Sequence, residues 1–286
     1  MNTRHIICLL AAAAVLSGPA RAQLQPGDET VGPGATATDV IPPWQMEFEN
    51  LSLEARRDYG SILGDAARLF GQKRIFEALN RIADADEIFP DNPVALNLKG
   101  ACYVEFRDFE KAREVFSLAF DKQKVVLSDI ENLPDEKRYA RMASVADILF
   151  NIAEMDFVTN NWQRAHDQFA DLLKNINPAK EQMIRLIELK LLIAKIKLGR
   201  MEEARTLAAK YDYLDDSPFY YYAKAALAYH EGDVETAERA RATARRVFQK
   251  PGMLAAWEDT MIEADYLKSF YGGDLAVDPT EVPVPE

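Results

Sequence analysis

The sequence predicts an all-α protein built from successive antiparallel helix pairs, and three observations support this prediction. Between about residues 50 and 271, apolar residues recur at spacings of three and four, the period of an amphipathic helix. The alternation of apolar and polar residues that is typical of strands is absent from this region. Small and apolar residues also recur 34 positions further along the chain. Helix pairs repeated in this way are expected to stack into a solenoid, because no pair can cover its own apolar surface.

The composition is that of a globular protein with an acidic surface. Hydrophobic residues make up 48% of the 286 residues, which is enough to bury a sizeable core. The 46 acidic residues outnumber the 34 basic ones and give a formal net charge of −12. A polyanion is repelled by such a surface, so nucleic acid is not expected as a main partner.

The first 22 residues have the pattern of an export signal. Arg4 precedes an uncharged apolar run over 6–16, and the small residues of a cleavage site follow at 20–22. The run has 11 residues, whereas a helix that spans a bilayer needs roughly 20. We therefore expect a signal peptide over 1–22, an exported protein (periplasmic or secreted), and no integral membrane segment after cleavage.

The segments on either side of the helical region are expected to lack fixed structure. Residues 23–49 contain turn formers without periodicity and are predicted to be a flexible linker. Residues 272–286 are acidic and rich in proline and are predicted to be a disordered tail. The repeat domain then covers 50–271, with a last helix from about Met253 to Tyr271 as its C-terminal cap. Cys102 lies in an apolar stretch of this domain and is expected to be a buried thiol.

The clearest internal similarity lies between residues 59 and 120. Six positions of the first copy carry small or apolar residues: Ile62, Ala66, Leu69, Ala78, Ile82 and Ala85. Each recurs 34 residues later, as Leu96, Gly100, Tyr103, Ala112, Phe116 and Ala119. This pattern resembles the tetratricopeptide repeat (TPR), which has the same period and small residues at the same places. The resemblance implies a right-handed TPR-like α-solenoid whose small residues, such as Gly100, Ala112 and Ala119, lie where the helices cross.

Three looser copies follow in the second half of the chain. The alanine near the start of each second helix marks the register of all five copies: Ala78, Ala112, Ala165, Ala204 and Ala237. The interval of 53 residues after Ala112 exceeds the repeat period and predicts an insertion, placed at Lys122 to Leu133.

The sequence contains no recognisable catalytic or cofactor-binding motif. The patterns HExxH, GxGxxG, GxSxG and GxxxxGK[ST] do not occur, so no catalytic residue, metal or cofactor is predicted. Two acidic clusters, 84–87 and 212–216, are interpreted as solvated helix ends. Paired carboxylates can also hydrolyse glycosides, which leaves an enzyme or accessory factor acting on cell-wall glycan as an alternative. A self-assembling structural component is a third hypothesis.

The resemblance to TPR proteins implies a non-enzymatic scaffold that binds a protein or peptide partner in a concave groove, in bacteria often during envelope assembly or secretion. The most prominent feature is the aromatic run from Phe219 to Tyr222, followed by Tyr229. At helical spacing we expect Tyr221 to face the core. Phe219, Tyr222 and Tyr229 are then expected to face the groove, with core packing of all of them as the alternative.

The same register adds side chains from earlier copies to the expected groove: Asn97, Ala101 and Glu105 from the second copy, and Phe150, Glu154 and Phe157 from the third. TPR proteins that bind chaperone C-termini carry lysines on this surface to hold a carboxylate. Lysine is missing from these positions, so a ligand of that kind is not expected.

Overall fold

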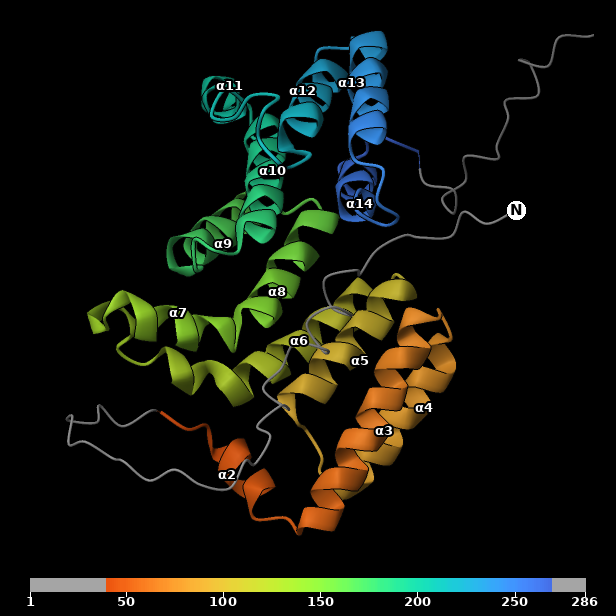
Figure 1. The fold of residues 1–286 in the computed structure, drawn as a ribbon, viewed down its shortest axis with the longest axis vertical. Helices are drawn as coiled ribbons and strands as arrows, with labels where there is room; N and C mark the ends of the chain where they lie inside the picture. The colour runs from red at the N-terminus through yellow and green to blue at the C-terminus, as the bar shows by residue number, and fades with distance from the viewer. Residues whose placement is uncertain (1–39, 269–286) are drawn as a thin grey trace, which may run out of the picture. The chain divides into compact units, whose positions relative to one another are not determined.

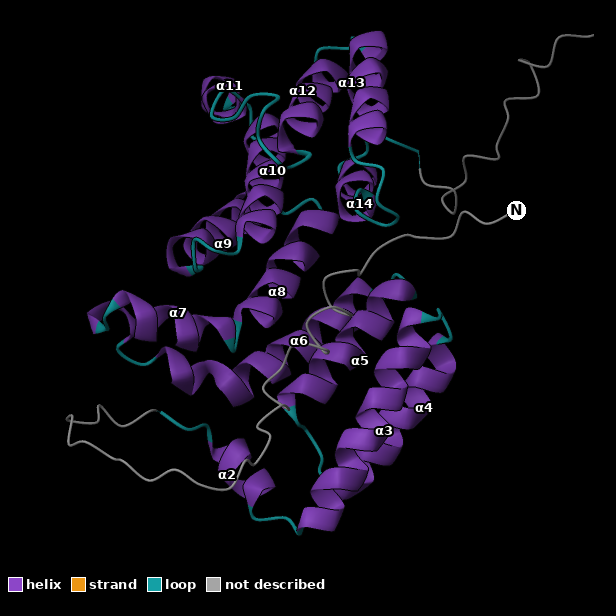
Figure 2. Cartoon of the chain, in the orientation of Figure 1, coloured by secondary structure: helices purple, strands orange, loops and turns teal. Residues whose placement is uncertain are grey.

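The computed structural model describes residues 40–268 of the chain. Within this range every regular element is a helix, so the predicted all-α class is confirmed (Figure 2). The expected signal peptide over 1–22 and the expected tail over 272–286 lie outside the described residues, as does the linker up to residue 39. None of the described helices combines the length and the apolar character needed to cross a membrane.

The described chain divides into two compact units. The N-terminal unit comprises residues 40–155 and 170–180, and the C-terminal unit comprises 156–169 and 181–268. Figure 1 labels the helices of both units.

The N-terminal unit is built from two helix pairs with additional elements at each end. Its first helices are α2 (Pro43–Glu49), α3 (Leu53–Gly71), α4 (Ile75–Ile88), α5 (Pro93–Glu105) and α6 (Phe109–Gln123). Helix α3 packs against α4, α5 packs against α6, and α4 contacts α5, so the two pairs stack. The sequence then continues through the 3₁₀ turns η1 (Lys124–Leu127) and η2 (Ile130–Asn132) to α7 (Asp135–Ala143) and α8 (Ala146–Val158). The insertion is therefore longer than predicted, because it also contains α7.

The last seven residues of the expected linker form helix α2 and pack on the first pair. The indole Nε1 of Trp44 donates a hydrogen bond to Oε1 of Gln123 at 2.7 Å. The Phe48 ring lies edge-on to Tyr59 with 5.1 Å between ring centroids. Helix α2 thus packs on the first pair through Phe48 and bonds the end of α6 in the second pair through Trp44, which explains why this part of the linker is ordered.

The C-terminal unit contains two further pairs and a final helix. Its helices are α9 (Trp162–Asn175, shared with the N-terminal unit), α10 (Glu181–Lys197), α11 (Met201–Ala208), α12 (Phe219–His230), α13 (Val234–Val247) and α14 (Ala255–Glu263). Helix α10 pairs with α11, α12 pairs with α13, and α12 packs on α10. Helix α14 is shorter than the expected cap over 253–271. A buried ion pair between Lys190 Nζ and Glu263 Oε2, 2.8 Å apart, connects it to α10.

The turn between the two helices has the same backbone geometry in all five copies. In each turn one residue has positive φ: Lys73, Arg107, Asn160, Gly199 and Gly232. Its N–H bonds the carbonyl three residues earlier, and the next N–H bonds the carbonyl five residues before itself, which is the Schellman motif. Each of these residues lies five positions before the alanine that marks its copy. All five of those alanines are fully buried. The structure therefore confirms the predicted starts of the second helices in the later copies.

Candidate functional site: an open groove beside helix α12

Helix α11 is much shorter than the second helices of the other pairs. It has 8 residues, whereas α4, α9 and α13 have 14 each. The chain leaves the helix after Ala208 and reaches α12 through residues 209–218, which include three aspartates, a serine and a proline. These residue types favour turns over helix continuation. A helix of ordinary length would cover the adjacent side of α12, and this side is therefore left open.

The open side of α12 forms the floor of a groove with a volume of about 510 Å³. We call this the α12 groove; its lining residues are Arg205, Ala208, Ala209, Tyr220, Lys224, Leu227, Ala228, Glu231, Asp233 and Thr236. Tyr220, Lys224, Leu227 and Glu231 follow one another at spacings of four, three and four along α12. They therefore share one face of the helix, with α11 on one side and the start of α13 on the other.

The α12 groove is apolar along much of its length and charged at defined points. Ala208, Ala209 and Leu227 supply apolar surface. Arg205 bonds Glu231 at 3.1 Å, so these two charges neutralise one another. Lys224 is exposed, and among the described residues no carboxylate lies within ion-pair distance of its ammonium group. The groove thus combines apolar contacts with the positive charge of Lys224 and, at the start of α13, the negative charge of Asp233, whose carboxylate accepts a hydrogen bond from the N–H of Thr236.

The apolar surface continues from the groove onto the loop that follows α11. Tyr213 and Leu214 are 64% and 73% exposed, which is unusual for large apolar side chains. The Tyr213 ring lies edge-on to Tyr220, with 6.5 Å between the centroids. Tyr213 therefore lies beside Tyr220, which lines the α12 groove.

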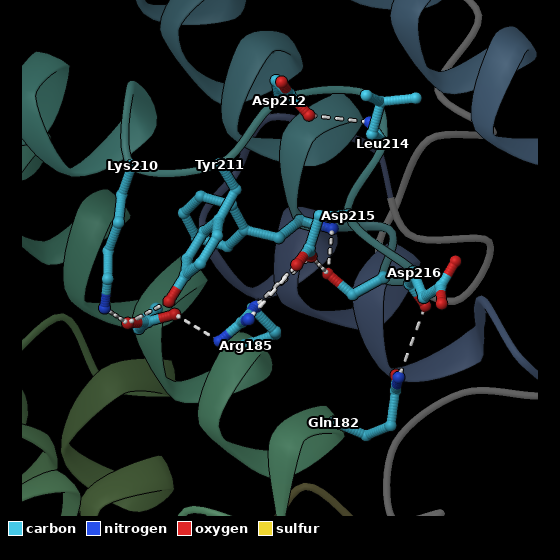
Figure 3. Close-up of polar contacts among 11 residues, drawn as sticks. Gln182, Arg185, Lys210, Tyr211, Asp212, Leu214, Asp215 and Asp216 are labelled. Atoms are coloured by element: carbon cyan, nitrogen blue, oxygen red, sulfur yellow. Dashed lines mark hydrogen bonds and ion pairs between the residues drawn. The ribbon is translucent and has the colours of Figure 1, made fainter.

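Ionic contacts with α10 fix the loop in place (Figure 3). The Arg185 guanidinium donates hydrogen bonds to both carboxylate oxygens of Asp215 at 3.2 to 3.4 Å, and it lies 3.7 Å from the centroid of the Tyr211 ring. The buried Glu188 accepts hydrogen bonds from the Lys210 ammonium at 2.5 Å and the Tyr211 hydroxyl at 3.1 Å. We call Arg185, Glu188, Lys210, Tyr211 and Asp215 the Arg185 cluster.

The charges in the Arg185 cluster stabilise one another at neutral pH. Burial by itself would raise the pKa of Asp215, but hydrogen bonds from Arg185 and Ser217 outweigh it and lower this pKa. Burial by itself would lower the pKa of Lys210, but the hydrogen bonds and charge interactions with Glu188 and Tyr211 together outweigh it and raise this pKa. Both groups are therefore ionised at neutral pH. Their ionic contacts then hold the loop that carries Tyr213 and Leu214.

The aromatic residues expected to bind a partner are mostly buried in the C-terminal unit. Phe219 and Tyr222 are fully buried, while Tyr221 is partly exposed. The prediction that Tyr221 faces the core and that Phe219 and Tyr222 face an open groove is therefore wrong. Different contacts bury the two side chains: the Phe219 ring lies edge-on to Tyr211, with 5.3 Å between the ring centroids, and Tyr222 packs against α14. The Tyr222 hydroxyl donates a hydrogen bond to Glu258 at 2.8 Å, and its ring lies 5.7 Å from that of Trp257.

Tyr229 is also engaged with the C-terminal end of the described chain. Its ring stacks on Tyr266 with 5.8 Å between centroids, and Arg241 donates a hydrogen bond to its hydroxyl at 3.0 Å. Phe157 is buried and lies edge-on to Trp162, with 5.1 Å between ring centroids. These two side chains therefore have packing roles within the C-terminal unit.

The expected groove residues of the N-terminal unit are likewise packed against protein. Asn97 is buried and accepts a hydrogen bond from the Asn151 amide at 2.9 Å, and Phe150 is buried too. Ala101 is fully buried, and Glu105 lies 2.7 Å from the Lys73 ammonium with only 12% of its side chain exposed. Burial raises the pKa of Glu105 more than Lys73 lowers it. None of these side chains forms an open surface within its unit.

Sequence reasoning missed the residues that do line an open surface: Tyr220, Lys224 and Leu227. Their positions are equivalent to Ile187, Leu191 and Ala194 of α10, which are all buried. Their exposure follows from the early end of α11. The one signal for that in the sequence is the run of aspartate, serine and proline over 212–218.

The two acidic clusters have structural partners. Asp84 is 2.6 Å from Arg81, and Asp86 is 3.3 Å from Lys99. In the second cluster Asp215 pairs with Arg185, and Asp212 accepts a hydrogen bond from the N–H of Leu214 at 2.8 Å. Among residues 40–268, no group of three or more histidine, cysteine, aspartate or glutamate side chains has an arrangement that could hold a metal ion.

Comparisons with protein-family models and with curated proteins find no match. A solved structure described as the functional characterisation of Pseudomonas aeruginosa pilF is similar, with 18% sequence identity and a TM-score of 0.34. The similarity covers 72% of this chain and 96% of that one. At this distance, the function has to be inferred from the residues of this chain.

Proposed function

We propose that this protein is a helical scaffold that binds a segment of a partner protein in the α12 groove. The observation that carries the proposal is a row of solvent-accessible side chains, Tyr220, Lys224 and Leu227, on the side of α12 that a longer α11 would cover. Concave sites with apolar walls and few polar groups are typical binding surfaces. The exposed Tyr213 lies beside Tyr220 and would add apolar contact area next to the groove.

The rigidity of the surroundings supports a recognition role. The two sides of the groove are helices, and the Arg185 cluster fixes the loop at its end. A preorganised surface loses little conformational entropy when a partner binds. The exposed Tyr213 and Leu214 are therefore carried by a loop whose neighbouring residues are already held in place, which suits them to contact a partner.

The cellular setting is proposed on sequence grounds. The pattern of residues 1–22 favours export, which would place the scaffold outside the cytoplasm. The resemblance of the repeats to TPR proteins favours a role in assembling other envelope or secreted proteins.

A photoreactive amino acid at position 224 of the full chain, expressed in its native host, tests the proposal. The cross-linked partner is identified, purified and titrated against wild-type protein by calorimetry. We expect Leu227→Ser and Tyr220→Ala each to weaken binding by about 30-fold, the effect of losing an interface hot spot.

Val247→Ser is the matched control, because Val247 is 53% exposed on α13 and does not line the groove. It should bind as tightly as wild type, and the thermal unfolding of all three variants should show that they are folded. Unchanged affinity of folded Leu227→Ser and Tyr220→Ala would refute the proposal.

A further inference from the structure

The α12 groove has the place and the direction of a missing helix segment. Helix α11 ends six residues earlier than the second helices α4, α9 and α13 would. At 1.5 Å per residue, six residues of helix span about 9 Å, or somewhat less than two turns. The side chains of α12 that such a segment would cover, among them Tyr220 and Lys224, are the ones that line the groove.

The lining of the groove is suited to a helix. Ala208 and Ala209 at the end of α11 and Ala228 on α12 have short side chains, which allow a neighbouring helix to approach closely. Leu227 and Tyr220 lie on either side of Lys224 along α12, at distances of three and four residues. A helix laid against this row would meet an apolar, a charged and an apolar side chain at successive turns.

The charges of the groove indicate which kind of residue a bound helix would place opposite Lys224. The other basic residue of the groove, Arg205, is already paired with Glu231 and with Glu202. Lys224 has no carboxylate partner among the described residues. A bound helix that carries an acidic residue at this point would supply one and would itself shield the pair from water, which makes an ion pair stronger than at an open surface.

We infer that the occupant of the α12 groove is a short amphipathic helix of a partner protein that continues the interrupted packing of α11. Its central acidic residue faces Lys224, and apolar residues about one turn before and after it contact Tyr220 and Leu227. This inference rests on the proposed function and adds the conformation and charge of the bound segment.

A peptide-display selection on the full chain tests the inference. The library holds 14-residue peptides in three backgrounds: helix-favouring, proline-containing and unbiased. The central position is Glu, Gln or Lys, and the flanking positions are varied among apolar residues. Selection is run on wild type, on Lys224→Glu, and on Lys250→Glu, an exposed lysine outside the groove that serves as the charge-matched control.

Wild type and Lys250→Glu are expected to enrich helix-favouring peptides with a central Glu by about tenfold over those with Lys. Lys224→Glu is expected to reverse this preference. The inference would be overturned if the same peptides were enriched equally on wild type and on Lys224→Glu. Preferential selection of proline-containing peptides would also overturn it. In both cases the proposed function, binding in the α12 groove, would still stand. Binders unaffected by Leu227→Ser would instead refute the proposed function itself.

Discussion

Gly100 of α5 lies directly against the ring of Phe116 in α6. A Cβ atom at position 100 would stand 2.5 Å from Cε1 of Phe116, closer than two carbon atoms can approach without a shift of one of them. In the preceding pair the equivalent residues are Ala66 and Ile82, and both are fully buried. The two pairs therefore fill equivalent helix crossings with different residues. In the second pair Gly100 faces the ring of Phe116, whereas in the first pair Ala66 occurs with the smaller Ile82.

Gly100→Ala should lower the free energy of unfolding. Overpacking is expected to lower the free energy of unfolding by about 1–3 kcal/mol. The higher helix propensity of alanine offsets roughly 1 kcal/mol of this loss. The double variant Gly100→Ala, Phe116→Ile recreates the residue pair of the first copy. It should be more stable than the sum of the two single effects by about 1 kcal/mol. Urea unfolding of the four proteins measures this coupling, and strictly additive effects would show that the two residues do not share a crossing.

This crossing also shows why the fold could be predicted from the sequence. The small residues Gly100, Ala112 and Ala119 recur with a fixed spacing because each is required where two helices meet, and a requirement of that kind is visible in one sequence. The extra helix α7 carries no such repeated signal, since it occurs once and its sequence is largely polar. The same holds for α2, whose short length gives no helical period.

Arg185→Lys should loosen the loop over 209–218 and leave the helices intact. Lysine has neither the planar fork that bonds both oxygens of Asp215 nor the flat face that lies over Tyr211. Hydrogen exchange of the loop amides is expected to rise about tenfold, as the loss of one charged hydrogen bond implies. Arg246→Lys on the exposed side of α13 is the control and should leave the loop unchanged. Equal exchange in wild type and Arg185→Lys would mean that the Arg185 cluster does not fix the loop.

Glu105→Gln should be at least as stable as wild type at pH 7 and lose this advantage in acid. The pKa of Glu105 is raised in the folded state, chiefly by burial, above an unfolded value of about 4.3. The protonated carboxyl therefore favours folding below that unfolded value, and this contribution is lost as the pH rises through the raised folded pKa. Unfolding free energies of both proteins between pH 4 and 7.5 test the sign. A difference that does not vary with pH would contradict it.

Cys102 should resist alkylation in the native protein. It is fully buried, and burial together with the nearby Glu105 raises its pKa to about 12, so almost no thiolate exists at neutral pH. Iodoacetamide followed by peptide mass spectrometry should find the Cys102 peptide unmodified in buffer and fully modified in denaturant. Rapid native labelling would show that the second pair opens frequently.

The candidate site could not be predicted in the same way as the fold. The helical period of α12 identifies two apolar faces, and the sequence does not say which of them another helix covers. Helix α14 covers Tyr222, Tyr211 covers Phe219, and the early end of α11 exposes the face with Tyr220 and Leu227. These facts depend on contacts with elements outside α12, whereas the repeat pattern reports only on packing that every copy shares.

Chemical-shift mapping is the most direct test of the α12 groove as the binding surface. Isotope-labelled full-length protein would be titrated with a helical peptide selected for binding. The account predicts that the affected amides lie in 205–209 and 220–236, with the largest effects near Lys224 and Leu227. Perturbations centred instead on Tyr222, Trp257 and Tyr266 would place the partner on the face that α14 now covers and would contradict the account.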